Sequence, residues 1–227
     1  MLELFKAGGW VMWPIALISA LSLAIILERF WTLRRKNVLP NGLGEEVREW
    51  ARHAHLDPKH IEALRTNSPL GELLAAGLDV RRRSRDVIRE RIEDTGRHVM
   101  HRLERYLNTL GTIASIAPLL GLFGTVVGMM SMFLGILDNG VGDMTKLAGG
   151  IGQALVTTAA GICVAIPALI FHRYFRGLVV SYVIEMERQA TALIDTLDSV
   201  AAPAPSAAKT SSSSHSADAD VAPRRRS

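Results

Sequence analysis

The sequence predicts an all-α polytopic membrane protein with three transmembrane helices and long cytosolic helical extensions. Of its 227 residues, 48% are hydrophobic and 21% are charged, but Asp, Glu, Lys and Arg are absent from residues 7–27, 106–137 and 147–171. A soluble chain distributes its charges, because each helix or strand needs a face in water. The mean hydropathy of +0.20 therefore averages two unlike parts. A single cysteine also excludes a disulfide scaffold.

The first predicted span covers residues 10–27, which read WVMWPIALISALSLAIIL. A membrane helix needs about 20 apolar residues, because it rises about 1.5 Å per residue through about 30 Å of hydrocarbon. Trp10, Trp13 and Trp31 bracket this run as aromatic anchors, and Pro14 falls in the first turn. A cleaved signal peptide is the alternative. We prefer a retained span, because the apolar stretch is long and Glu28-Arg29 follows it directly.

The second and third spans lie in the remaining charge-free runs. Residues 106–137 would extend about 48 Å as a helix, which exceeds the thickness of a bilayer. We therefore place the second span at residues 113–137. We expect one continuous helix that starts near Arg85, outside the membrane, and runs into this span. The third span, residues 147–171, fits a bilayer with some tilt.

The distribution of cations predicts the orientation. Residues 34–36 are three successive cations just after the first span, and Arg173 and Arg176 follow the third span. The loop at residues 138–146 carries two acids against one lysine. Since cations gather on the cytoplasmic side, the N-terminus is expected outside and the C-terminus inside, with Arg173 and Arg176 anchoring the lipid interface.

The cytosolic segments have a helical pattern. Ser68-Pro69 predicts a helix start, residues 88–110 place apolar side chains at three- and four-residue steps, and this pattern resumes to about Val200. The following Ala-, Pro- and Ser-rich tail lacks periodicity, so we expect disorder there. The expected segments are a periplasmic N-terminus (1–9), span one (10–27), a cytosolic helical region (28–112), span two (113–137), a periplasmic loop (138–146), span three (147–171), a cytosolic helix (172–200) and the tail (201–227).

No motif of a soluble enzyme is present. The sequence has no phosphate-binding glycine loop, no cysteine pair and no nucleophile elbow. The histidines of residues 53–60 and 98–101 imitate metal spacing, but a solvated helix face explains them better, and Cys163 is read as packing. The pI of 9.6 reflects membrane orientation, not nucleic-acid binding. We expect no enzymatic activity, no cofactor, no metal and no nucleic-acid partner.

Small residues form a stripe on each of the last two spans. One comprises Gly121, Thr125 and Gly128; the other comprises Ala154, Thr158, Gly161, Ala165 and Ala168. Such stripes let helices approach closely, and a threonine there bonds across the gap or back to its own helix. Ordinary close packing is the simpler interpretation, and a hydrated path is the alternative.

No Asp, Glu, Lys or Arg lies near the centre of any predicted span. A proton relay through a membrane usually needs one, because a hydroxyl aligns water but holds no charge. If protons cross the membrane here, a second chain must therefore supply the carboxylate.

Two segments resemble the MotA/TolQ/ExbB proton-channel family, with ExbB and TolQ as the best match. They are APLLGLFGTVVGM at residues 117–129 and GGIGQALVTTAAGICVAIPAL at residues 149–169. ERFWTL at residues 28–33, three spans and an outside N-terminus also fit ExbB and TolQ. The resemblance covers roughly residues 8–200.

The resemblance implies a homopentameric ring in a bacterial inner membrane, enclosing helices of an ExbD- or TolR-type single-span partner. That partner's aspartate carries the proton, and Thr125 and Thr158 match the family's channel threonines. The implied function is a proton-channel or stator subunit that couples proton motive force to work, within a TonB- or Pal-type system. Gly121, Gly128, Ala154, Gly161 and Ala165 would then pack against partner helices.

One residue departs from the family pattern. Many ExbB and TolQ chains carry glutamate where Gln153 stands, and glutamine does not titrate. We expect Gln153 to hydrogen-bond near the outer entrance of the path. Two other functions stay open: a homo-oligomeric channel that needs no partner, and a non-conducting membrane scaffold.

Overall fold

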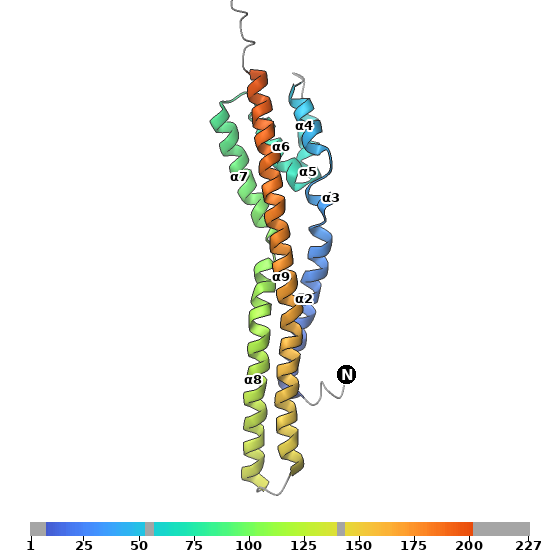
Figure 1. Ribbon diagram of the computed structural model, residues 1–227, viewed down its shortest axis with the longest axis vertical. Helices are drawn as coiled ribbons and strands as arrows, with labels where there is room; N and C mark the ends of the chain where they lie inside the picture. The colour runs from blue at the N-terminus through green and yellow to red at the C-terminus, as the bar shows by residue number, and fades with distance from the viewer. Residues whose placement is uncertain (1–7, 53–56, 140–143, 202–227) are drawn as a thin grey trace, which may run out of the picture.

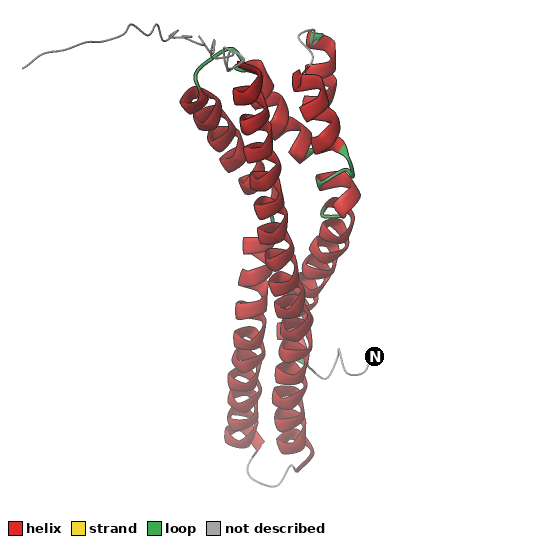
Figure 2. Cartoon of the chain, turned by 45° about the horizontal axis from the view of Figure 1, so that its top comes forward, coloured by secondary structure: helices red, strands yellow, loops and turns green. Residues whose placement is uncertain are grey.

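The computed structural model describes residues 8–52, 57–139 and 144–201, and every regular element in these ranges is a helix (Figure 2). The elements are η1 (Gly9–Val11), α2 (Met12–Thr32), α3 (Arg35–Val38), α4 (Leu43–Arg52), α5 (Pro58–Asn67), α6 (Pro69–Asp79), α7 (Arg85–Leu103), α8 (Leu107–Asn139) and α9 (Met144–Ala201). Three helical stretches, which contain α2, α8 and α9, are long and apolar enough to cross a membrane. The predicted all-α class with three such helices is confirmed.

The helices form an elongated rod around α9 (Figure 1). α9 has 58 residues and is therefore about 87 Å long. Its first half lies beside α8 and α2, whereas its second half is surrounded by α4, α6 and α7 (Figure 1). One helix thus connects the apolar end of the molecule to its charged end.

Local capping explains where α5 and α6 begin. The Asp57 carboxylate accepts a hydrogen bond from the Lys59 amide at 3.0 Å, and the Ser68 hydroxyl accepts one from the Gly71 amide at 3.1 Å. Each cap precedes a proline at the first helical position, where the missing N–H costs nothing. The helix start predicted at Ser68-Pro69 is confirmed.

The expected continuous helix from Arg85 into the second span is wrong. α7 ends at Leu103, α8 begins at Leu107, and between them Tyr106 has a left-handed φ of 63°. Leu103 and Leu107 are both buried, so the apolar spacing continues across the break. Periodicity therefore could not reveal it.

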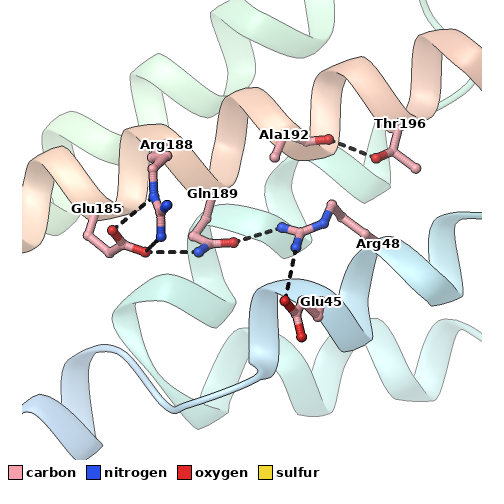
Figure 3. Close-up of polar contacts among 7 residues, drawn as sticks. All are labelled: Glu45, Arg48, Glu185, Arg188, Gln189, Ala192 and Thr196. Carbon is pink, nitrogen blue, oxygen red and sulfur yellow. Dashed lines mark hydrogen bonds and ion pairs between the residues drawn. The ribbon is translucent and has the colours of Figure 1, made fainter.

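Polar contacts attach α4 to α9 on the charged half (Figure 3). Arg48 donates to the Gln189 Oε1 at 2.8 Å, and Gln189 donates to the Glu185 Oε1 at 2.9 Å. Arg188 donates to both carboxylate oxygens of Glu185, at 2.7 and 3.0 Å. The bonds from Arg188 and then Gln189 lower the pKa of Glu185. At the far end of the rod, Arg85 pairs with two aspartates of α9 at 2.6 and 2.9 Å.

Candidate functional site

The small-residue stripes pack α8 against α9 of the same chain. A Cβ atom on Gly121 would lie 3.0 Å from the Thr157 carbonyl oxygen, and one on Gly128 would lie 2.9 Å from the Gly150 carbonyl oxygen. A Cβ on Gly161 would lie 3.0 Å from the Gly121 Cα. All of these neighbours are backbone atoms, so the helices approach this closely only because the side chains are absent.

The other residues assigned to partner packing are also covered by this contact. Ala154 and Ala165 are each 7% exposed, and Gly121, Gly128 and Gly161 are buried. Packing within one chain therefore buries all five of these residues. That these residues admit a partner helix stays a prediction.

The two expected channel threonines make different hydrogen bonds. The Thr158 hydroxyl donates across the helix gap to the Gly121 carbonyl at 3.2 Å. The Thr125 hydroxyl donates to the Leu122 carbonyl of its own helix at 2.6 Å. Both residues are half-buried, so each hydroxyl lies at the edge of the α8–α9 contact.

η1 and the start of α2 cover one side of the α8–α9 pair. Val11, Met12 and Ile15 pack there against residues of both helices, namely Leu120, Val127, Ala160 and Val164. Trp10 adds an edge-to-face contact with Phe123, with ring centroids 6.1 Å apart. This side of the pair is therefore occupied within the chain.

Thr125 and Thr158 lie toward the opposite side, which we call the open flank. Successive helical residues turn by about 100°, which places Leu122 and Met129 beside Thr125 and away from Leu120 and Val127. Leu122 is 58% and Met129 49% exposed. On α9, the same geometry places the exposed Leu155 and Ile162 beside Thr158. The open flank is thus an exposed apolar surface with two hydroxyl groups at its edge.

Gln153 does not join the two threonines. It is half-buried, and its side-chain amide lies against Gly9 of η1. Gln153 and Thr158 are five residues apart on α9, so they point about 140° away from each other. The structure therefore places Gln153 on the side of α2.

Sequence reasoning missed Thr157, the fully buried neighbour of Thr158. Its hydroxyl donates to the carbonyls of Gln153 and Ala154, both at 3.0 Å, and its side chain faces Gly124. The stripe pattern selected Thr158 because it follows Ala154 by four residues. The available signal was a second pair of positions: Gly124 precedes Thr125 just as Thr157 precedes Thr158, and Gly124 and Thr157 face each other.

Arg173 and Arg176 are exposed where α9 leaves its apolar stretch, and neither has an ion-pair partner among the described residues. Aromatic rings surround this level: Phe30 of α2 stacks on Tyr174 and makes an edge contact with Phe175. Aromatic and basic side chains together are typical of a membrane interface. This arrangement fits the expected anchoring role.

The histidine clusters provide no metal site in the described part of the chain. His60 contacts Trp50, with ring centroids 5.8 Å apart, and His98 and His101 are on α7. His53 and His55 lie outside the described residues. Cys163 is exposed on α9 as a free thiol.

The three apolar helices do not begin and end at the same levels. η1 and the start of α2 lie beside Val127 and Gln153, whereas α8 continues another 12 residues to Asn139. Those residues add about 18 Å. A bilayer that covers residues 10–27 would therefore not cover all of residues 113–137 and 147–171. These span limits stay predictions.

Comparisons with a family model and with individual proteins indicate the same family. Residues 65–188 match the MotA/TolQ/ExbB proton channel family. A biopolymer transport protein ExbB-like 1 from Synechocystis sp. is 36% identical over 181 residues, covering 78% of this chain and 71% of the relative. An ExbB-like 3 protein of the same organism is 30% identical over 176 residues, covering 76% and 83%. The biopolymer transport protein ExbB of Salmonella typhimurium is 39% identical over 95 residues, covering 42% of this chain and 37% of that protein.

Proposed function

The chain belongs to the MotA/TolQ/ExbB proton channel family, and on that premise we propose that it is the stator subunit of an inner-membrane motor of the ExbB–ExbD or TolQ–TolR type. As a member of this family it is a non-enzymatic transport protein. In the proposed role, proton flow through a homopentameric ring drives movement of a partner bundle inside it. The work is done on a periplasmic or outer-membrane protein, such as a TonB-type system.

One observation carries this proposal. Thr125 and Thr158 bring hydroxyl groups to the edge of the open flank, while no Asp, Glu, Lys or Arg lies between residues 107 and 137 or 147 and 171. A proton path through such a surface lacks the group that binds the proton. A partner helix with an aspartate completes the path when it lies against the open flank.

In this proposal the small residues pack the two helices of one chain together. Gly121, Gly128 and Gly161 keep α8 and α9 in backbone contact, so the pair acts as one wall of the ring. The partner helix then contacts the exposed side chains of the open flank, Leu122, Met129, Leu155 and Ile162. Gln153 contacts η1 on the side of α2, and its role near the outer entrance of the path stays a prediction.

The proposed energy source is sufficient for stepwise motion. One charge that moves through 100 mV releases about 2.3 kcal/mol, and several transfers add together. Arg173 and Arg176 hold the inner end of the apolar stretch of α9 at the cytoplasmic surface, where their guanidinium groups are exposed and have no acidic partner among the described residues.

Proton flux in reconstituted vesicles tests the proposal. The chain is co-expressed with a single-span protein that carries an aspartate in its membrane helix, and a pH-sensitive dye is enclosed in the vesicles. We expect flux only with the partner, and none when the partner's membrane aspartate is changed to asparagine. Flux from this chain alone would identify a self-contained channel, and silence of the intact complex would identify a scaffold.

The same vesicles report orientation. In a Cys163→Ser background, a cysteine introduced by Glu49→Cys should react with a membrane-impermeant maleimide only when the cytoplasmic face is outside. Glu49 is exposed on α4, so the thiol is accessible to the reagent. Reaction from the opposite face would contradict the proposed topology.

A further inference from the structure

Arg29 is a charged side chain buried at the joint between α7 and α8. It lies two residues after the expected end of the first span and is only 2% exposed. Burying an unpaired charge is costly, so a buried arginine is expected to have its donors occupied. Arg29 is neither on the proposed proton path nor among the proposed lipid anchors.

The guanidinium group bonds to the end of α7. Nη1 donates to the Leu103 carbonyl oxygen at 3.1 Å, while Nε and Nη2 donate to the Glu28 carboxylate at 2.6 and 3.2 Å. Thr32 donates to the same carboxylate at 2.9 Å, which holds Glu28 in place. The last carbonyls of a helix lack intrahelical partners and carry partial negative charge, so a cation is favourable there. Here that cation comes from another helix, α2.

The joint itself is strained. Tyr106 has a φ of 63°, a left-handed conformation that is unfavourable for a bulky side chain. Two guanidinium groups lie over its ring, with the Cζ atom of Arg29 5.3 Å and that of Arg105 4.8 Å from the ring centroid. Such cation–π contacts stabilise the ring where it is.

The local sequence does not explain the break. Glu104-Arg105-Tyr106 contains neither glycine nor proline, and its flanking residues Leu103 and Leu107 are buried in the same core. A continuous helix would satisfy the backbone without a left-handed residue. The contacts from α2 are therefore the described interactions that favour a bend at this position.

We propose that Arg29 is a positioning residue: through it, α2 fixes the α7–α8 joint and so sets the rotation and height of α8, including Thr125, on α9. The consequence for conduction rests on the proposed function. If the joint relaxes toward a continuous helix, residues 104–106 join the helical path and α8 turns relative to α9. Thr125 on α8 then no longer lies level with Thr158 on α9 at the edge of the open flank.

Hydrogen exchange tests the positioning directly. The full-length protein with its partner is placed in nanodiscs, and exchange is followed in peptides covering residues 100–110. We expect Arg29→Met to speed exchange there by about tenfold, because it frees the Leu103 carbonyl and unpairs Glu28. Arg34→Met is the matched control: Arg34 is an exposed cation on the same stretch that stacks on Trp31 at 5.3 Å, and its loss should leave the exchange unchanged.

Proton flux and rescue separate positioning from simple stabilisation. Arg29→Met should reduce partner-dependent flux about tenfold while the partner still copurifies, and Arg29→Lys should recover part of both signals because an ammonium group still reaches one acceptor.

If Arg29→Met does not assemble, Glu28→Gln takes its place, since it removes the paired charge and keeps the arginine. Unchanged exchange in these variants would contradict the proposal that Arg29 fixes the α7–α8 joint. Wild-type flux together with faster exchange would contradict the proposed link between the joint and conduction. If the wild-type complex conducts no protons, the proposed function fails, whereas the exchange experiment still decides the role of Arg29.

Discussion

At the scale of single residues, the Thr158 hydroxyl makes the interhelical bond to which the proposed function gives most weight. Valine keeps nearly the same volume and removes only the hydroxyl. We expect Thr158→Val to abolish proton-driven coupling, because the path loses a group that aligns water, while assembly with the partner is retained. Dye-reported flux and copurification of the partner measure the two properties.

Thr157→Val is the matched control for this change. Thr157 is fully buried and bonds only within α9, at 3.0 Å to each of two carbonyls. Its loss should cost about 1 kcal/mol of stability and leave coupling intact. Equal coupling in both variants would show that the Thr158 hydroxyl has no special role.

The sequence predicted which residues make important contacts only where these residues belong to a local pattern. Thr125 and Thr158 lie in small-residue stripes, so their spacing pointed to the α8–α9 contact. Arg29 had no such signal, because its partner Leu103 is 74 positions away and contributes a backbone atom. Tyr106 was equally hidden, since a left-handed conformation is unexpected for tyrosine.

At the scale of elements, the α8–α9 contact makes a prediction about glycine. An added Cβ at position 161 would lie 2.5 Å from the Ala117 carbonyl oxygen and 3.0 Å from the Gly121 Cα. Both of these neighbours are backbone atoms of α8, so the two helices would have to separate. We expect Gly161→Ala to destabilise the protein by about 1–3 kcal/mol. Thermal unfolding in detergent, followed by circular dichroism, measures the loss.

The control lies on the same helix. A Cβ at Gly152 meets nothing within 4 Å, so Gly152→Ala adds helix propensity without a clash. This variant should be neutral or up to about 1 kcal/mol more stable. Equal effects at positions 152 and 161 would mean that backbone contact does not hold the two helices together.

Helix existence was predictable, whereas helix ends were predictable only where capping residues mark them. Ser68-Pro69 gave the start of α6, because the hydroxyl cap and the proline act locally. The end of α7 is bonded by Arg29 of α2 and was not visible in the apolar spacing. The α4–α9 contact through Arg48 and Gln189 joins residues 141 positions apart, so no local pattern predicts it.

At the scale of the whole molecule, the segregation of charge determined the architecture. Ion pairs occur on the charged half, for example between Arg85 and Asp195, and the apolar half is held by glycine contacts. α9 runs through both halves, so one continuous helix links the apolar end of the molecule to the helices of its charged half. A protein with this layout transmits motion along its length, as the proposed stator requires.

The unequal lengths of the apolar helices have a consequence for the lipid around them. α2 begins beside Val127 while α8 continues to Asn139, so a bilayer matched to α2 leaves apolar side chains of the α8–α9 hairpin beyond its hydrocarbon layer. Hydrophobic mismatch of this kind is relieved by helix tilt or by local thickening of the lipid. Flux should therefore rise as the acyl chains are lengthened from 14 to about 20 carbons in reconstituted vesicles; a flat response would mean that the hairpin tip is covered by protein instead of lipid.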